Sequence, residues 1–379
     1  MTYEYLRAEI SISAIRKNLR LLRRCVAPGV KFCPAVKCNA YGHGIGIVLQ
    51  ALEGQVDCLA VVTPAEALEL RSLGYKGAIL LLIPAAAADD AMDVPALLDE
   101  LLKQRIILTT TTCAQVRDIQ AAARRVGCEA QVHVKLDSGM TRSGVSASEA
   151  GALVEAIRSS SPVRLAGIYT HLACADDANK ESAYEQIARF EMILEECGIA
   201  PGDGVIRHAA NSPGTIDLPD SHFDMVRPGI SMYGYHSSDE MHNRPPIQPS
   251  LRLTGPLLQV RRVPAGTRCG YGLTHTFAGP GVVGIVPIGY GDGYFRALSN
   301  RGVMRIGGRE APVRGRVSMD QTIIDLTSVP DARVGMEVEI ISNDSRAPNS
   351  VENISRLLGT IPQEVVTAIG HRVARIAVE

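Results

Sequence analysis

Two hydrophobic periods alternate from about residue 12 to residue 235, and this alternation constrains the fold more strongly than any other feature of the sequence. Helical stretches carry apolar residues three or four positions apart; in residues 13–26, for example, Ile15, Leu19 and Leu22 share one face. Short runs that are apolar on both faces lie between the helical stretches, as expected of buried parallel strands. We count eight such runs, at residues 32–36, 58–62, 78–83, 106–108, 131–136, 163–169, 205–209 and 225–226.

Eight strands that alternate with helices over about 225 residues predict a (β/α)8 TIM barrel, which we place at residues 12–240. A doubly wound open sheet remains the alternative, because periodicity alone miscounts strands by about one or two. After residue 245 the sequence turns to short β-type runs, split by Gly and Pro, at residues 257–263, 282–288, 303–306 and 338–341. They predict a mostly β second domain at 241–379, which residues 1–11 join as a strand.

Composition narrows the class of protein. The chain of 379 residues is longer than a single core usually grows, so two domains are expected. Its 39 Lys and Arg balance 40 Asp and Glu, which argues against a nucleic-acid partner. No apolar run reaches the roughly 18 residues of a membrane span, and we find no secretory signal. The nine cysteines include no CxxC pair, so we expect reduced thiols in the cytoplasm and no metal site.

Lys37 directly follows the first apolar run, so it stands at the C-terminal end of a predicted barrel strand. Barrel enzymes carry their catalytic groups at that end of the strands. Desolvation at such a position lowers the pKa of a lysine, and the neutral amine can form a Schiff base with a carbonyl compound. The residues alone leave open a simpler interpretation, in which Lys37 caps a strand and Tyr41 is a core aromatic.

The segment that begins at this strand end, Ala-Val-Lys-Cys-Asn-Ala-Tyr-Gly-His-Gly at residues 35–44, closely resembles the cofactor-lysine signature of the alanine racemase family. This family depends on pyridoxal 5'-phosphate (PLP) and has fold type III. Seven further segments resemble family motifs in the same order, at residues 135–142, 170–173, 210–212, 227–234, 269–272, 287–293 and 315–321. The resemblance spans almost the whole chain. It implies a barrel followed by a mostly β domain, and a homodimer in which two subunits share each active site.

The resemblance implies a racemase with two bases. Racemisation removes a proton from one face of Cα and returns one to the other, which two acid–base groups do best. Lys37 is similar to the lysine that binds PLP, and Tyr271 to the second base, which reaches the site from the partner subunit. A free phenol has a pKa of about 10. The family couples this tyrosine to a histidine and an arginine, which correspond here to His171 and Arg227.

Arg227 is similar to the arginine that faces the pyridine nitrogen of PLP. Arginine can only donate hydrogen bonds, so the ring nitrogen has to accept and stays unprotonated. An unprotonated ring is a weaker electron sink, which disfavours transamination relative to racemisation.

The other motif residues have implied contacts with the cofactor or the substrate. The resemblance implies cofactor contacts for Tyr41, Arg142, His171, Asn211, Ser212, Gly229 and Ile230. It implies substrate contacts for Arg142, Tyr290, Met319 and Asp320. Lys135 is similar to a lysine that is carbamylated in some members of the family, where the resulting anion holds the neighbouring arginine.

Three positions depart from the family pattern. Cys38 stands where Ala is common, and Thr141 stands where Gly is common; both residues are small and leave the implied roles intact. The larger departure is His371, which replaces a tyrosine that donates a hydrogen bond to the cofactor phosphate. We expect His371 to make this contact in its place.

The resemblance implies an alanine racemase that acts on a small amino acid and supplies D-alanine for peptidoglycan. From composition we expect it to bind neither nucleic acid nor membrane. The alternative within the family is a serine or broad-specificity racemase. A decarboxylase on the same fold would carry an acidic residue at the position of Arg227. A non-catalytic PLP carrier would end with the barrel, whereas this chain continues through Tyr271.

Overall fold

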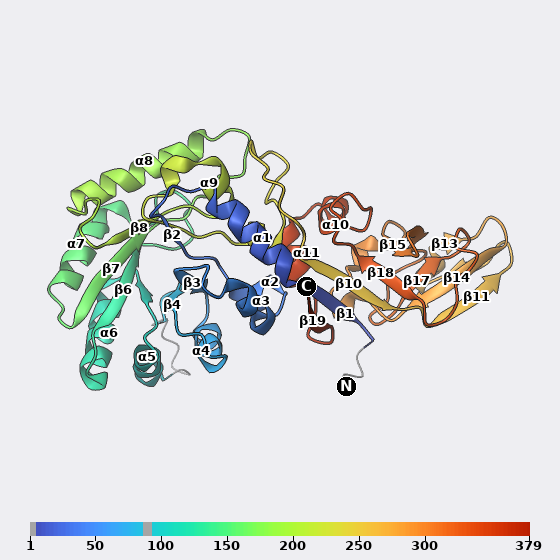
Figure 1. Cartoon of the computed structure of the whole chain (residues 1–379), viewed down its shortest axis with the longest axis horizontal. Coiled ribbons are helices and arrows are strands. Elements are labelled where there is room, and N and C mark those ends of the chain that lie inside the picture. The colour runs from blue at the N-terminus through green and yellow to red at the C-terminus, as the bar shows by residue number, and fades with distance from the viewer. Residues whose placement is uncertain (1–4, 86–92) are drawn as a thin grey trace.

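The computed structural model describes residues 5–85 and 93–379, so residues 1–4 of the predicted N-terminal strand lie outside the described part. A rounded α/β part joins a narrower, mostly β part (Figure 1). One hydrophobic core continues from the first part into the second, from Leu6 to Val373. None of the helices in the two described ranges is long and apolar enough to cross a membrane.

The α/β part is a closed eight-stranded barrel, so the predicted TIM barrel is confirmed and the open sheet is excluded. Each of the eight predicted runs overlaps one strand: β2 (Lys31–Phe32), β3 (Cys58–Val61), β4 (Ala78–Leu81), β5 (Leu108–Thr110), β6 (Ala130–Lys135), β7 (Val163–Tyr169), β8 (Ile206–His208) and β9 (Met225–Val226). All ladders between neighbouring barrel strands are parallel. The last strand pairs with the first, since Phe32 lies opposite Val226.

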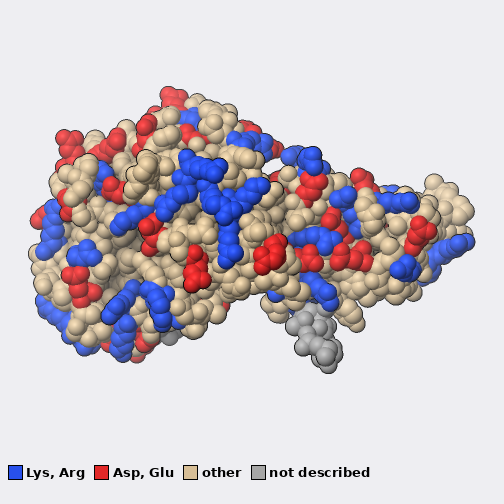
Figure 2. Space-filling view, viewed as in Figure 1, with Lys and Arg blue, Asp and Glu red and all other residues tan. Residues whose placement is uncertain are grey.

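Helices surround the barrel (Figure 1). Their bounds are α1 (Ile12–Arg23), α3 (Ile45–Leu52), α4 (Pro64–Ser72), α5 (Val94–Lys103), α6 (Cys113–Val126), α7 (Ala147–Arg158), α8 (Glu181–Glu196) and α9 (Ser212–Asp217). Helix α1 has the predicted two-sided character: Ile15, Leu19 and Leu22 are buried, and its basic side chains gather on the surface over α1 in Figure 2. Side chains that cap backbone N–H groups start several helices, at Ser11, Thr63, Asp93, Thr112 and Asn211.

The β part consists of two sheets and a small hairpin. The six-stranded sheet has the order β16 (Arg309–Pro312), β15 (Val303–Ile306), β18 (Glu337–Ile341), β10 (Leu251–Pro256), β1 (Arg7–Ser11) and β19 (Ala374–Val378). The three-stranded sheet has the order β11 (Gln259–Val263), β14 (Gly281–Val286) and β17 (Thr322–Asp325). The hairpin pairs β12 (Arg268–Cys269) with β13 (His275–Thr276), and helices α10 (Val351–Leu358) and α11 (Pro362–Thr367) precede β19.

The first and last strands of the chain lie side by side in the six-stranded sheet. Strand β1 pairs with β10 on one edge and with β19 on the other, with Ala8 opposite Leu253 and Arg375. Ala8 and Ile10 are fully buried there. The segment that leads into the barrel is therefore itself part of the β domain.

Asn18 of α1 ties the barrel to the segment that leads into the β domain. Its amide nitrogen donates to the carbonyls of Met232 (3.1 Å) and Gln248 (2.8 Å), and its amide oxygen accepts from the Gln248 N–H (2.8 Å). The side chain is fully buried. Because buried backbone groups are costly to leave unpaired, a single side chain stabilises the joint of the two parts.

We therefore expect Asn18→Ala to lower the free energy of unfolding by about 2–3 kcal/mol, because it leaves backbone groups of Gln248 unpaired in the interior. Urea unfolding followed by circular dichroism measures the loss. Lys17→Ala is the matched control, an exposed position of the same helix, and should change stability by less than about 0.5 kcal/mol. Equal effects of the two substitutions would show that Asn18 does not hold this joint.

Candidate active site

Lys37 begins a short turn at the C-terminal end of the first barrel strand, as predicted. The turn is α2 (Lys37–Tyr41), in which Cys38, Asn39, Ala40 and Tyr41 all have φ near +53°. For residues with a side chain, the left-handed conformation costs about 1–2 kcal/mol each. Backbone strain of this kind persists only where the surroundings enforce it, and it is concentrated at functional sites.

Glu66 holds this strained turn from the neighbouring strand end. One carboxylate oxygen accepts from the Cys38 N–H (2.7 Å), and the other accepts from the N–H groups of Val62 (2.9 Å) and Thr63 (3.0 Å). Thr63 and Glu66 form a capping box at the start of α4. The sequence reasoning missed Glu66, although the Thr-x-x-Glu spacing before a helix is a recognisable signal.

Arg227 follows β9 and is a buried cation without an acidic partner. Its guanidinium donates to the carbonyls of Thr170 (2.8 Å) and Ala209 (3.2 Å) and to His208 Nδ1 (2.7 Å). It lies over the Tyr169 ring, 5.1 Å from the centroid. The side chain is almost inaccessible, and no salt bridge to it occurs within residues 5–85 and 93–379. All of its charge therefore stays available to a ligand in the barrel.

His171 follows β7 and contacts Arg227, as the sequence predicts. Its Nδ1 lies 3.4 Å from a guanidinium nitrogen of Arg227, so Nδ1 is the acceptor. Burial holds the pKa of His171 well below its usual value, and the cations Arg227, Arg142, Lys135 and Lys37 lower it further. A neutral ring that accepts at Nδ1 carries its proton on Nε2.

Lys135 and Arg142 lie close together without an acidic side chain between them. Lys135, at the end of β6, donates to Ser143 Oγ at 2.5 Å. Its pKa is lowered to about 8, first by burial and then by the charge of Arg142. The nearby Asp137 forms no salt bridge with Lys135 among the described residues, and its Oδ1 accepts from the N–H groups of Gly139, Met140 and Thr141. The pair thus leaves a place for an anion.

Thr141, which precedes Arg142, adopts a left-handed conformation with φ of 55°. A β-branched residue with positive φ is strained, whereas glycine adopts this conformation freely. The expectation that Thr141 is a harmless small residue therefore missed a conformational cost, which the sequence does not reveal.

The predicted phosphate contacts come together at the start of α9 and the turn after Arg227. Ser212 Oγ accepts from the N–H groups of Gly229 (2.7 Å) and Ser231 (3.3 Å). An added β-carbon at Gly229 would lie 2.5 Å from the Tyr41 hydroxyl, so only glycine leaves this space open. Ile230 is buried in the turn η2 (Ile230–Tyr233). These residues form a compact group of hydroxyl and N–H donors.

Asn211 sits beside this group but its side chain is engaged in the fold. Its oxygen accepts from the Gly214 N–H at 3.0 Å and caps α9, while its nitrogen donates to the Leu172 carbonyl at 3.2 Å. The residue therefore fixes the position of Ser212 relative to the loop after β7.

The predicted residues of the β domain form a separate, exposed patch. Tyr271, Met319 and Tyr290 are 71%, 53% and 44% exposed. Met319 accepts from the Gly291 N–H (2.9 Å), and the turn η3 (Tyr271–Leu273) packs on the residues just before Met319. In the described part of the chain, no hydrogen bond or salt bridge joins Tyr271 or Met319 to Lys37 or Arg227.

His371 and Arg372 lie in the turn before β19. His371 is exposed, and the structure shows no side-chain hydrogen bond for it within the described ranges. Arg372 instead makes the ion pairs of this turn, with Asp292 (2.9 Å) and with the predicted substrate residue Asp320 (2.8 Å). The turn that carries His371 therefore lies beside Asp320.

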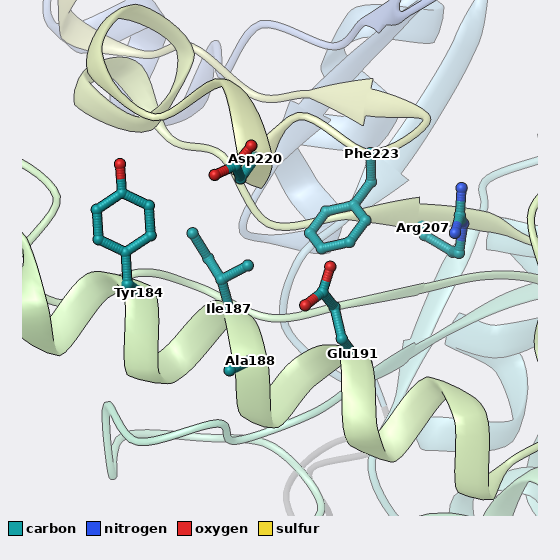
Figure 3. Close-up of a pocket in the computed structure, with 7 residues that line it drawn as sticks. All are labelled: Tyr184, Ile187, Ala188, Glu191, Arg207, Asp220 and Phe223. Atoms are coloured by element: carbon teal, nitrogen blue, oxygen red, sulfur yellow. The ribbon is translucent and has the colours of Figure 1, made fainter.

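A shallow cleft of about 510 Å³ lies away from all of these residues (Figure 3). It is on the outer surface of the barrel, between α8 and the loop before β9. Its walls are Tyr184, Ile187, Ala188, Glu191, Arg207, Asp220 and Phe223. None of the residues predicted to act on a cofactor or substrate lines it, so this cleft is separate from the candidate site.

Comparisons with known proteins agree with the site motifs. The family models for the alanine racemase N-terminal and C-terminal domains match residues 10–237 and 250–377. A curated alanine racemase of Desulfosudis oleivorans is 37% identical over 97% of this chain and 95% of its own length. An alanine racemase of Methanococcus maripaludis is 36% identical over 97% of both chains.

Solved structures of similar proteins superpose over the whole length. An alanine racemase of Clostridium difficile matches with a TM-score of 0.90 and 33% identity, over 100% of this chain and 97% of its own. The alanine racemase of Bartonella henselae, described with covalently bound pyridoxal phosphate, matches with a TM-score of 0.85 and 29% identity, over 99% of both chains. The chain therefore belongs to the alanine racemase family, a family of PLP-dependent amino-acid isomerases.

Proposed function

We propose that this protein interconverts L-alanine and D-alanine with PLP bound through Lys37, and so supplies D-alanine for peptidoglycan. The observation that carries the proposal is Arg227, a buried donor with no acid beside it. A decarboxylase or transaminase needs the opposite at the pyridine nitrogen, an acid that protonates it. The relatives named alanine racemase support alanine as the substrate, and a serine or broad-specificity racemase is the competing assignment.

The residues of the barrel mouth fit PLP. Lys37 would hold its aldehyde carbon, and Arg227 would donate to its ring nitrogen, with His171 packed beside the ring. Arg142 would contact the phenolic oxygen and the substrate carboxylate. The phosphate would meet the hydroxyls and N–H groups of Tyr41, Ser212, Gly229 and Ile230, with Asn211 positioning Ser212. When bound, PLP supplies the electron sink that acidifies the α-proton of the amino acid.

Lys37 and Tyr271 would then move the proton on opposite faces of Cα. When Lys37 removes a proton from one face, the Tyr271 hydroxyl delivers one to the other face, and the reverse sequence runs the reaction backwards. His171 keeps a proton on Nε2 and presents it toward the site, because its Nδ1 faces Arg227. This N–H can donate to the Tyr271 oxygen and stabilise its deprotonated form. Met319, Asp320 and Tyr290 would line the substrate pocket from the same domain as Tyr271.

We propose that the active unit is a homodimer. Each subunit has a barrel of residues 12–240 and a β domain of residues 241–379, to which residues 1–11 add a strand. The exposed group around Tyr271, Tyr290 and Met319 supports this proposal, because exposed apolar side chains that cluster are typical of a protein–protein interface. Each site would combine the barrel of one subunit with the β domain of the other. The nine unpaired cysteines support a cytoplasmic location.

His371 remains a predicted phosphate contact. Its exposed position in the turn before β19 leaves the side chain free to reach a ligand, and an imidazole nitrogen can donate as the family tyrosine does.

The proposed activity is tested by incubating the purified protein with L-alanine and with L-serine and separating the products by chiral chromatography. We expect D-alanine to form faster than D-serine. In Lys37→Ala, we expect both racemisation and the visible absorption of bound cofactor to disappear, because the cofactor loses its covalent anchor and one base. Full turnover in Lys37→Ala, or faster conversion of serine, would contradict the proposed assignment.

Shared active sites are tested by mixing two inactive variants, Lys37→Ala and Tyr271→Phe, under conditions in which subunits exchange. One of the two sites in a hybrid dimer then contains both intact bases, so we expect up to about half of the wild-type activity per hybrid. Two Lys37→Ala preparations mixed in the same way are the control and should stay inactive. If exchange is demonstrated by mass spectrometry but no activity returns, each site is completed within one chain.

Carbamylation of Lys135 is a further part of the proposal. Its neutral amine would attack CO2, forming an N–C bond and releasing a proton, and the carbamate anion would then hold the neighbouring Arg142 cation. The lowered pKa of about 8 makes more neutral amine available as the pH rises from about 7 to about 9. At constant dissolved CO2, we expect a carbamate carbon signal in 13C NMR to grow over this range.

The carbamate signal should vanish in Lys135→Ala and persist in Lys103→Ala, which removes an exposed lysine of α5. A signal that survives in Lys135→Ala would place the modification elsewhere, and its absence from wild-type protein would leave Lys135 unmodified.

A further inference from the structure

Two histidines of the barrel interior touch across an intervening strand. His133 lies on β6 and His208 on β8, and their nitrogens Nδ1 and Nε2 are 2.9 Å apart. Because neighbouring strands are about 4.8 Å apart, residues two strands apart meet only when the strand between them leaves room. Gly167 of β7 leaves that room: an added β-carbon would lie 2.5 Å from the His133 ring.

The strand register places His133 over this glycine. The β6–β7 ladder shifts between Val132 and His133, so that His133 lies opposite Gly167 and Ala166 is skipped. Both histidines are buried, with 2% and 0% of their surface exposed. Tyr169, two residues after Gly167, stacks on the His208 ring at 4.7 Å between centroids. The contact is thus built into the barrel by register, glycine and packing together.

Arg227, His208 and His133 form a hydrogen-bonded series, and Arg227 determines where the protons of the two histidines lie. Arginine only donates, so His208 Nδ1, which lies 2.7 Å from the guanidinium, must carry a lone pair. A neutral His208 then has its proton on Nε2 and donates it to His133 Nδ1. His133 in turn carries its proton on Nε2, a buried atom for which the structure shows no partner.

We propose that His133 is a positioning residue for Arg227: by accepting the Nε2 proton of His208, it holds the His208 ring in the tautomer and the position in which Nδ1 receives the Arg227 guanidinium. Hydrogen bonds are donated in one direction only, from Arg227 to His208 and from His208 to His133, because the guanidinium cannot accept. Reversing the proton on His208 would set two N–H groups against each other and displace the guanidinium.

The chemical advantage of this chain is an acceptor that carries no negative charge. Burial lowers the pKa of His133 to about 3 and that of His208 well below its usual value, and the Arg227 cation lowers both further. Both rings therefore stay neutral. A carboxylate in their place would orient the guanidinium equally well but would neutralise its charge, which the proposed function requires at the pyridine nitrogen. In this respect the inference rests on the proposed function.

The tautomer is measured without cofactor or turnover, by 15N NMR of the histidine rings in protein stripped of PLP. We expect His208 Nδ1 to resonate in the pyridine-like range and Nε2 in the pyrrole-like range. In His133→Leu, which removes the acceptor, these signals should move toward those of a mixture of tautomers. His133→Asn restores an acceptor oxygen near the position of Nδ1 and should restore the wild-type pattern.

The racemase activity of the PLP-bound enzyme provides the second readout. We expect kcat to fall about tenfold in His133→Leu, as for a lost buried hydrogen bond, and to recover in His133→Asn. Tyr169→Phe is the structural control: it removes the hydroxyl contacts to Leu82 (2.9 Å) and Thr109 (3.0 Å) but keeps the ring on His208. The His208 signals should be unchanged in this variant.

Gly167→Ala tests the same chain from the opposite side, because the added methyl group displaces the His133 ring while leaving both histidines present. It should reproduce the His133→Leu spectrum. The opposite tautomer in wild-type protein, or an unchanged His208 pattern in His133→Leu, would overturn the proposal. Failure to racemise alanine would refute only the proposed function, since the tautomer of His208 is read in the absence of substrate and cofactor.

Discussion

A buried positive charge without a buried negative one is the constraint on which the rest of the site depends. Moving a cation out of water is strongly unfavourable unless dipoles or charges compensate it. Around Arg227 the compensation comes from two carbonyls, two neutral imidazoles and an aromatic face. None of these removes the charge. The barrel therefore presents a full cation at its mouth, and the arrangement is stable only while every neighbouring dipole keeps its orientation.

Strain in the backbone is concentrated around the same opening. Four consecutive residues after Lys37 are left-handed, and Thr141 before Arg142 is left-handed as well. Each conformation opposes folding by about 1–2 kcal/mol, so other contacts have to enforce it. Glu66 and the carboxylate of Asp137 do so through backbone N–H groups. Two acidic side chains thus act on the main chain and leave the cations of the site unneutralised.

The β domain contributes a different property, exposure. Its six-stranded sheet holds both ends of the described chain, with β1 between β10 and β19. On this support the turns that carry Tyr271, Tyr290 and Met319 extend into solvent. These side chains are therefore accessible to a second molecule, whereas Arg227 and Lys135 are buried inside the barrel.

The sequence by itself determined the barrel, the order of its strands and the identity of the motif residues, because period and local motif are properties of short segments. Lys37, Arg227 and His171 could be placed at strand ends for this reason. The contact between His133 and His208, the left-handed φ at Thr141 and the hydrogen bond from the Cys38 N–H to Glu66 were not predicted. These features depend on strand register, on which residue faces a glycine and on distances between segments far apart in the chain, and only the tertiary structure decides those.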